Sequence, residues 1–199
     1  MTIIEICNMA LSRIGRGRII SLDDNNEESR QCKMFYDMCR QSLLKDYDWG
    51  FAKRIEQMAQ VDSKHFGWQY VYAYPSNCLQ ILRIYNSYGE SLVHKIDEAD
   101  EWDIFNMSGS NQAVACDVDS AMVEYIIDIR DSGIYSAQFC DALAWRLAAE
   151  IAIPLTGDAN MRNNSWQFYE MMVRKVKTNA ARERNVDKET TNRYLKARS

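Results

Sequence analysis

With 199 residues, of which 47% are hydrophobic and 26% charged, the chain has the composition of an ordinary globular protein and can bury one sizeable core. Two prolines and eight glycines exclude a low-complexity linker, and no apolar run approaches the roughly 18 to 20 residues that span a bilayer. We therefore expect a soluble protein with no membrane partner, folded as one compact domain that can carry an insertion.

The net charge of -4 conceals an asymmetry between the two parts of the chain. The last 26 residues, 174–199, contain nine Lys or Arg and three Asp or Glu, which makes them +6. The first 173 residues therefore carry -10, the difference between -4 and +6. A basic end of this kind indicates either an arm for nucleic acid or a docking segment for an acidic protein surface, and charge alone does not separate the two.

The first predicted elements are two helices within residues 1–50. Thr2 and Glu5 have the spacing of a capping box that begins a helix, and Gly15 and Gly17 end it. The acidic and Asn-rich run 23–28 supplies caps for a second helix, which we expect to end near residues 47–50. Apolar residues recur at helical spacing on both, as a core-facing stripe requires.

Residues 51–131 change to short β-like runs and predict a β-rich insertion. Alternation predicts a strand over 68–74, which Pro75 ends. Residues 79–85 and 121–129 are further strand candidates, and 114–118 and 92–96 are weaker ones.

Four aromatic rings fall on one face of the strand predicted over 68–74. These are Trp68, Tyr70, Tyr72 and Tyr74. A stacking platform for single-stranded nucleic acid needs flanking cations, and only Lys64 and Arg83 lie near in the sequence. The pattern therefore favours a core or a subunit interface, and we predict a subunit interface at these four residues.

The strongest single pattern is the helix predicted over 136–154. Phe139, Leu143, Leu147 and Ile151 recur every four residues beside several alanines, which indicates a buried central helix. We expect it to stop at Pro154 and Gly157.

The last part of the chain predicts a long fourth helix. Asp158 can cap a helix that runs to about Arg184, so that residues 132–184 supply the last two bundle helices. Residues 185–199 are polar, and we expect an extended basic tail. The predicted fold class is therefore α+β, with a bundle of about four helices and a β-rich insertion between the second and third.

No set of residues predicts catalysis. His65 and His94 are the only histidines and lie in no metal-binding spacing. Residues 15–18 (Gly-Arg-Gly-Arg) follow a helix, whereas a phosphate-binding loop precedes one, so a helix stop is favoured. We predict no catalytic residue, no cofactor, no metal and no enzymatic activity.

The cysteines and the N-terminus indicate the compartment. The six cysteines are widely spaced with no C-x-x-C pair, so we expect free, buried thiols. They are Cys7, Cys32, Cys39, Cys78, Cys116 and Cys140. Glu5 interrupts the apolar run that a signal peptide would need, so we expect the protein in the cytoplasm where it is made.

Several sequence pieces, in order, carry a resemblance to a known family. They are Ala-Leu-x-x-Ile-Gly at 10–15, Trp-x-Phe-Ala at 49–52, Tyr-Pro-x-x-Cys-Leu at 74–79, and the Leu- and Ala-rich helix of 142–156 that runs into Ile-Pro-Leu-Thr. This series resembles the tail tubular protein A family, the head-to-tail adaptors or connectors of short-tailed bacteriophages. The resemblance covers most of residues 1–170, while the C-terminal segment has no counterpart in it.

The resemblance implies a structural virion protein. Members of that family are helical bundles with a β-rich insertion that form a twelve-subunit ring beneath the portal. By resemblance, the partners are other copies of the chain, the portal protein, the tail nozzle protein, and DNA that passes through the channel without sequence-specific binding. The location implied is the neck or tail of the virion, with the host cytoplasm during assembly.

Two hypothetical contact regions follow from the ring. The basic tail would dock on the portal, with Tyr194 and Leu195 as anchors and Arg193, Lys196 and Arg198 as steering charges. A ring interface needs two different complementary patches on each subunit, and Met-rich sides are reasonable contributors beside the aromatic strand. The methionines are Met9, Met34, Met38, Met171 and Met172.

The alternative function is a nucleic-acid-binding regulatory protein that uses the same basic C-terminal tail on phosphates. It predicts a steep loss of DNA affinity with salt, with a log-log slope of about 0.9 per contacted phosphate of duplex.

Overall fold

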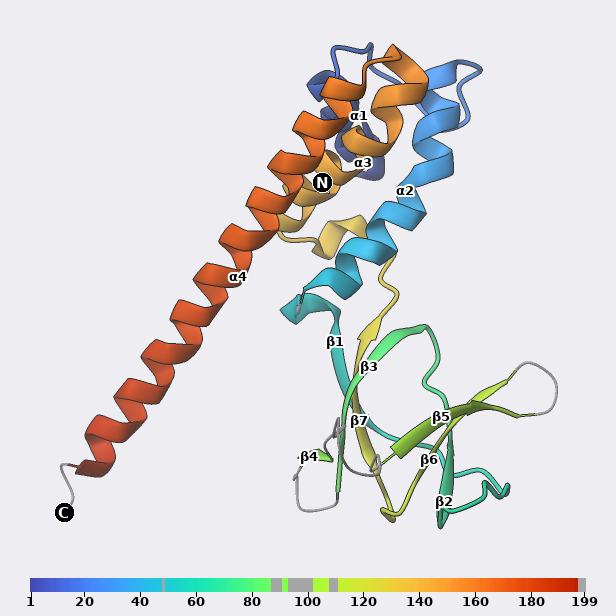
Figure 1. Cartoon of the computed structure of the whole chain (residues 1–199), viewed down its shortest axis with the longest axis vertical. Coiled ribbons are helices and arrows are strands. Elements are labelled where there is room, and N and C mark those ends of the chain that lie inside the picture. The colour runs from blue at the N-terminus through green and yellow to red at the C-terminus, as the bar shows by residue number, and fades with distance from the viewer. Residues whose placement is uncertain (48, 87–90, 93–101, 108–110, 197–199) are drawn as a thin grey trace. The chain divides into compact units, whose positions relative to one another are not determined.

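The computed structural model describes residues 1–47, 49–86, 91–92, 102–107 and 111–196, and their side chains except for 91–92 and 179–196. The chain divides into two compact units. One is built from both ends of the chain, Met1–Leu43 and Asp131–Ser199, and we call it the helical unit. The other, Leu44–Arg130, is the β unit. The predicted α+β class, with a β-rich insertion between the second and third helices, is confirmed (Figure 1).

The helical unit contains α1 (Ile3–Arg13), most of α2 (Glu27–Asp46), α3 (Ala137–Thr156) and α4 (Ala159–Lys196). The predicted capping box begins α1: the Glu5 backbone N–H donates to Thr2 Oγ1 at 3.2 Å, and the Thr2 N–H donates to the Glu5 carboxylate at 2.8 Å. Gly15, at φ 69°, follows the end of α1, as the sequence predicted. In Figure 1, α3 runs between α2 and α4.

The predicted central helix is α3, and its apolar stripe is buried. Phe139, Leu143, Leu147 and Ile151 are all fully inaccessible. Fully burying side chains of this size contributes about 1.5 to 3 kcal/mol each. Alanines at 142, 144, 148, 149 and 152 are buried between them and leave room for close helix packing.

The predicted stop of this helix at Pro154 is wrong, because α3 continues through Pro154 to Thr156. Pro154 has no N–H to donate to the preceding turn, but the residues after it do bond back, since the Thr156 hydroxyl donates to the Ala152 carbonyl at 2.6 Å. The predicted stop at Gly157 is confirmed: its left-handed φ of 69° suits glycine, and its N–H donates to the Ile153 carbonyl at 2.9 Å.

The long fourth helix is confirmed at its start and corrected at its end. The Asp158 carboxylate accepts from the Asn160 N–H at 2.7 Å and so caps α4 as predicted. The backbone stays helical to Lys196, so the predicted helix end near Arg184 and the extended tail are wrong for residues 185–196. The sequence contains no Gly or Pro after Gly157, so no strong helix-stop residue interrupts this helix. At 1.5 Å per residue, α4 is nearly twice as long as α3.

The β unit consists of two antiparallel sheets. The first has the strand order β1-β7-β3-β4, with β1 (Lys53–Gln57), β7 (Met122–Ile127), β3 (Cys78–Tyr85) and β4 (Ser91–Leu92). The second has the order β2-β6-β5, with β2 (Tyr70–Ala73), β6 (Gln112–Cys116) and β5 (Trp102–Asn106). A common core takes side chains from both sheets, including Tyr72, Ile84, Trp102, Val114 and Val123.

The strands predicted over 68–74, 79–85, 114–118 and 121–129 correspond to β2, β3, β6 and β7. Of the weak candidate 92–96, only residue 92 is described, in β4, and the rest lies outside the described residues. The sequence did not predict β1 or β5. β1 reads Lys-Arg-Ile-Glu-Gln with four exposed residues, and it is a strand because β7 pairs with it along its length.

None of the helices within the described part of the chain combines the length and the apolar character that crossing a membrane requires.

Candidate functional site

The aromatic strand predicted over 68–74 corresponds to β2, and its central tyrosine lies in the core of the β unit. Tyr72 is only 1% exposed, and its hydroxyl donates to the Val118 carbonyl at 2.6 Å. This placement overturns the predicted interface role of Tyr72, because a buried ring has no surface to offer another subunit. Tyr70 and Tyr74 are half-buried and pack against the same core, and Trp68 is half-buried before the strand begins. Their interface role stays a prediction.

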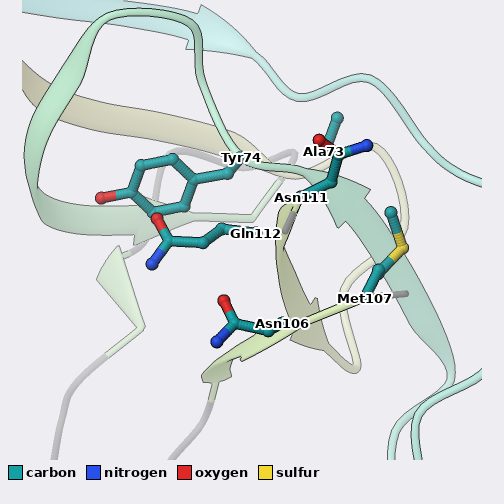
Figure 2. A pocket seen from close by; sticks show the side chains of 6 residues that line it. All are labelled: Ala73, Tyr74, Asn106, Met107, Asn111 and Gln112. Atoms are coloured by element: carbon teal, nitrogen blue, oxygen red, sulfur yellow. The ribbon is translucent and has the colours of Figure 1, made fainter. Parts of the chain in front are cut away.

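A pocket of about 710 Å³ lies at one end of the three-stranded sheet (Figure 2). Asn106 at the end of β5 is paired with Gln112 at the start of β6, and the Tyr74 N–H donates to the Gln112 carbonyl at 3.3 Å. The ring of Tyr74 and the carboxamides of Gln112 and Asn106 extend in the same direction in Figure 2. Ala73, Met107 and Asn111 complete the lining.

This pocket can donate and accept hydrogen bonds, but the described residues that line it hold no carboxylate, imidazole or thiol. Burial raises the pKa of Tyr74, whose hydroxyl lies 3.4 Å from the Cys78 sulfur. The phenol is therefore neutral and offers no base. The sequence analysis missed this pocket, because Tyr74, Asn106 and Gln112 are far apart in the chain and belong to no motif.

The surroundings of His65 and of Gly15 indicate roles in packing and in ending a helix. His65 stacks on Phe105 with ring centroids 3.9 Å apart, and its Nε2 lies 3.0 Å from the Asp103 carboxylate. His94 lies outside the described residues. Gly15 follows the end of α1, where the Arg16 N–H donates to the Leu11 carbonyl at 2.9 Å. The predicted helix stop is thereby confirmed for residues 15–18. Among the described residues, no three metal-ligating side chains come together.

The cysteines are free, as predicted, and five of the six are buried, whereas Cys78 is half-buried. A hydrogen bond with Cys32, together with burial, raises the pKa of the Cys7 thiol. Burial raises the pKa of Cys39 to about 12. A thiol held protonated at neutral pH is a poor nucleophile, so Cys7 and Cys39 act as small apolar core groups.

The predicted portal anchors lie at the end of α4. Residues 193–196 belong to the helix, although their side chains are outside the description, and Arg198 lies outside the described residues. The described part of α4 already carries cations on its surface: Arg174, Lys175 and Lys177 are exposed. Arg174 lies 3.5 Å from the Glu170 carboxylate and is 81% exposed.

Exposed apolar side chains lie next to one another on α2 and on α4 within the described part of the helical unit. On α2, Met34 and Met38 are one turn apart with Asp37 between them, and we call these three residues the α2 flank. On α4, Phe168, Met171 and Lys175 form the α4 flank. Of the five methionines predicted to contribute to an interface, Met34, Met38 and Met171 are exposed, whereas Met9 and Met172 are half-buried.

The α4 flank is held in place by aromatic packing. Phe168 stacks on Trp145 of α3 with ring centroids 4.6 Å apart, and the guanidinium of Arg13 lies 4.0 Å from the centroid of the same Trp145 ring. Arg13 also forms an ion pair with Asp141. α1, α3 and α4 therefore fix the orientation of an aromatic side chain that is still 43% exposed.

Taken together, the described residues offer surfaces for contact and no assembled catalytic group. No protein-family model matches this chain, and a search of curated proteins finds no match either.

Proposed function

We propose that the chain is the subunit of a head-to-tail adaptor of a short-tailed bacteriophage. In this proposal about twelve copies form a ring between the portal and the tail nozzle, and DNA passes through the channel of the ring. The observation that carries the proposal is the order of elements. Two helices, a β-rich insertion and two further helices follow one another, and both ends of the chain build one helical unit.

The distribution of charge supports a passage for DNA. Residues 1–173 carry -10, so a ring built from this part presents mostly negative charge to a phosphate backbone. Like charge lowers the affinity for DNA and lets the backbone slide past. The +6 of residues 174–199 then serves a protein partner, because a basic helix complements an acidic surface.

The surfaces of the helical unit also suit an assembly protein. Met34, Met38, Phe168 and Met171 are each more than 40% exposed, and apolar side chains of this size gathered on a surface are typical of a contact region. The described residues around the pocket near Tyr74 include none of the acid-base pairs that an enzyme site would need.

The test is to mix the full chain with a candidate portal complex and measure the mass of the product by mass photometry. The proposal expects the portal to gain the mass of a complete ring of subunits. A variant that lacks residues 185–199 should remain folded by circular dichroism and fail to join the portal. Unchanged docking of this variant would overturn the role of the segment, while portal complexes that never bind the full chain would overturn the adaptor function.

One observation favours a second candidate, the nucleic-acid-binding regulatory protein: nine Lys or Arg occur within residues 174–199. Duplex binding measured by fluorescence anisotropy against salt separates the two. A log-log slope of about 0.9 per contacted phosphate would favour the regulatory protein, and no binding at low salt would dismiss it.

A further inference from the structure

We propose that subunits associate head to tail, with the α2 flank of one copy bound to the α4 flank of the next. This inference rests on the proposed function, in which copies of the chain form a ring, and it names the two surfaces that would meet. A closed ring needs a heterologous interface, and therefore two different and complementary patches on each subunit. The helical unit carries such a pair.

The α2 flank faces away from the core of its own unit. Cys32, Tyr36, Cys39 and Leu43 are buried along one side of α2. Met34 and Met38 are on the opposite side of the helix and are 67% and 46% exposed. Asp37 projects beside them with 63% of its side chain exposed. Its carboxylate accepts from the Arg40 Nε–H at 3.0 Å, so this flank is a flexible thioether surface whose central charge is paired within the same helix.

The α4 flank lies on a different helix and has the matching chemistry. Met171 is 55% exposed and Phe168 43% exposed, and Lys175 is exposed one turn further along. Methionine sulfur makes favourable contacts with aromatic rings, and the stack on Trp145 already fixes the ring of Phe168. A methionine of one copy therefore finds an ordered aromatic ring on the next copy at a low entropic cost.

The two flanks lie on two different helices of the helical unit. In Figure 1, α3 runs between α2 and α4, so the two flanks belong to helices that a third helix separates. One copy can therefore use both flanks at once, each with a different neighbour. This is the requirement for a chain of subunits that closes into a ring.

Charge favours this pairing over either flank meeting itself. The sequence around the α2 flank, residues 22–46, contains six Asp or Glu and four Lys or Arg. The described part of α4, residues 159–178, contains four Lys or Arg and one Glu. Two α2 flanks would bring together two segments with a net charge of -2 each, and two α4 flanks would bring together two segments with a net charge of +3 each. Only the mixed pair sets opposite charges together.

The test is a complementation experiment by sedimentation velocity with the full chain at concentrations up to about 1 mM, which reveals contacts with millimolar dissociation constants. One variant carries Met34→Glu and Met38→Glu, and the other carries Met171→Glu and Lys175→Glu. All four positions are exposed, so circular dichroism should show unchanged folding. Ile20→Glu, at a position that is 90% exposed but outside both flanks, is the matched control.

The unchanged chain and the Ile20→Glu control should form species that grow with concentration. Each flank variant alone should lose all species above the monomer. A mixture of the two variants should form dimers and nothing larger, since it contains one intact pair of flanks. A wild-type chain that stays monomeric up to the highest concentration would overturn the inference. So would two variants that fail to rescue each other.

The portal experiment separates this inference from the function on which it rests. If both flank variants still join a portal as complete rings, the named interface is wrong and the adaptor function stands. If the wild-type chain joins no portal but the variants behave as expected in sedimentation, the adaptor function fails and the interface stands.

Discussion

The helical unit and the β unit are stabilised in different ways. The core of the helical unit consists mainly of aliphatic side chains and alanines along α3, where eleven residues are buried. The core of the β unit contains tyrosines whose hydroxyl groups need partners. Tyr72 donates to the Val118 carbonyl, Tyr85 to the Glu124 carboxylate at 2.6 Å, and Tyr125 to the Glu56 carboxylate at 3.0 Å. Close apolar packing along α3 therefore dominates the first unit, although it also buries Arg40, whereas the second adds hydrogen bonds from tyrosine hydroxyls to its core.

We expect the largest loss of stability when a buried side chain of the helical unit is truncated. We expect Leu147→Ala to lower the free energy of unfolding by about 2 to 5 kcal/mol, because the side chain is fully inaccessible and α1 and α4 both pack on α3. Urea unfolding followed by circular dichroism measures the loss. Hydrogen exchange should show that it is concentrated in the helical unit. Ile153→Ala on the same helix is the control, since Ile153 is 46% exposed and its truncation should cost far less.

In the β unit, we expect the removal of a charge at constant volume to lower the free energy of unfolding more at a buried carboxylate than at an exposed one. Glu124 is only 8% exposed, accepts from Tyr85, and lies 3.5 Å from the ammonium group of Lys53. Glu124→Gln keeps the shape and weakens both interactions, at a cost of about 1.5 to 3 kcal/mol, the range for hydrogen bonds to charged groups.

Glu56→Gln is the matched control for this charge effect, because Glu56 also accepts from a tyrosine but lies on the exposed edge strand β1. Urea unfolding should rank Glu124→Gln well above Glu56→Gln. Equal costs would show that burial does not strengthen the interaction and would remove the contrast between the two units.

The same contrast explains which elements could be predicted from the sequence. The periodicity of Phe139, Leu143, Leu147 and Ile151 predicted α3, because burial on one side of a helix imposes a repeat on the sequence itself. β1 has no such repeat: its residues are exposed, and its strand conformation comes from pairing with β7, which is about 70 residues away in the chain. Long-range pairing of this kind leaves little local trace.

The candidate surfaces were predictable only in part. Composition marked the basic segment and the methionines, but helical spacing alone did not establish that Met34 and Met171 are exposed while Met9 is half-buried. That difference depends on which faces α3 covers. The pocket near Tyr74 was not predictable, because strand pairing alone brings Tyr74 and Asn106 to the same end of a sheet.

We expect a smaller loss of stability from substitutions at residues with a left-handed backbone conformation, of which each unit has an example. Gly157 ends α3 at φ 69° with open space around the position of a β-carbon, so Gly157→Ala should cost about 1 to 2 kcal/mol in conformational energy alone. Asn77 adopts φ 54° in the turn before β3, and Asn77→Ala should cost a similar or smaller amount. Gly50→Ala is the control, since Gly50 has open space and no left-handed φ. Thermal unfolding should leave the Gly50→Ala variant unchanged, and an equal loss in all three variants would contradict the conformational explanation.

The last prediction concerns the loss of folding stability in alkali. We expect no such loss at neutral pH and a gradual loss above pH 9. Burial raises the pKa of the Cys39 thiol in the helical unit from 9.0 to about 12. Burial, and then the hydrogen bond to Glu56, raise the pKa of Tyr125 in the β unit from 10.0 to about 12. A raised pKa means that the folded state binds the proton more tightly, so the stabilisation is complete below the unfolded pKa and is lost as pH rises towards the folded pKa.

The contribution of Cys39 should therefore decline from pH 9 to 12, and that of Tyr125 from pH 10 to 12. Urea unfolding at a series of pH values measures both slopes. Tyr125→Phe removes the ionisable group and should make the loss of stability between pH 10 and 12 shallower, while the region between pH 9 and 10 stays as steep as in the wild type. If the slope above pH 10 does not change in this variant, Tyr125 ionises as readily in the folded chain as in the unfolded one. The dependence of the β unit on satisfied tyrosine hydroxyls would then not extend to this residue.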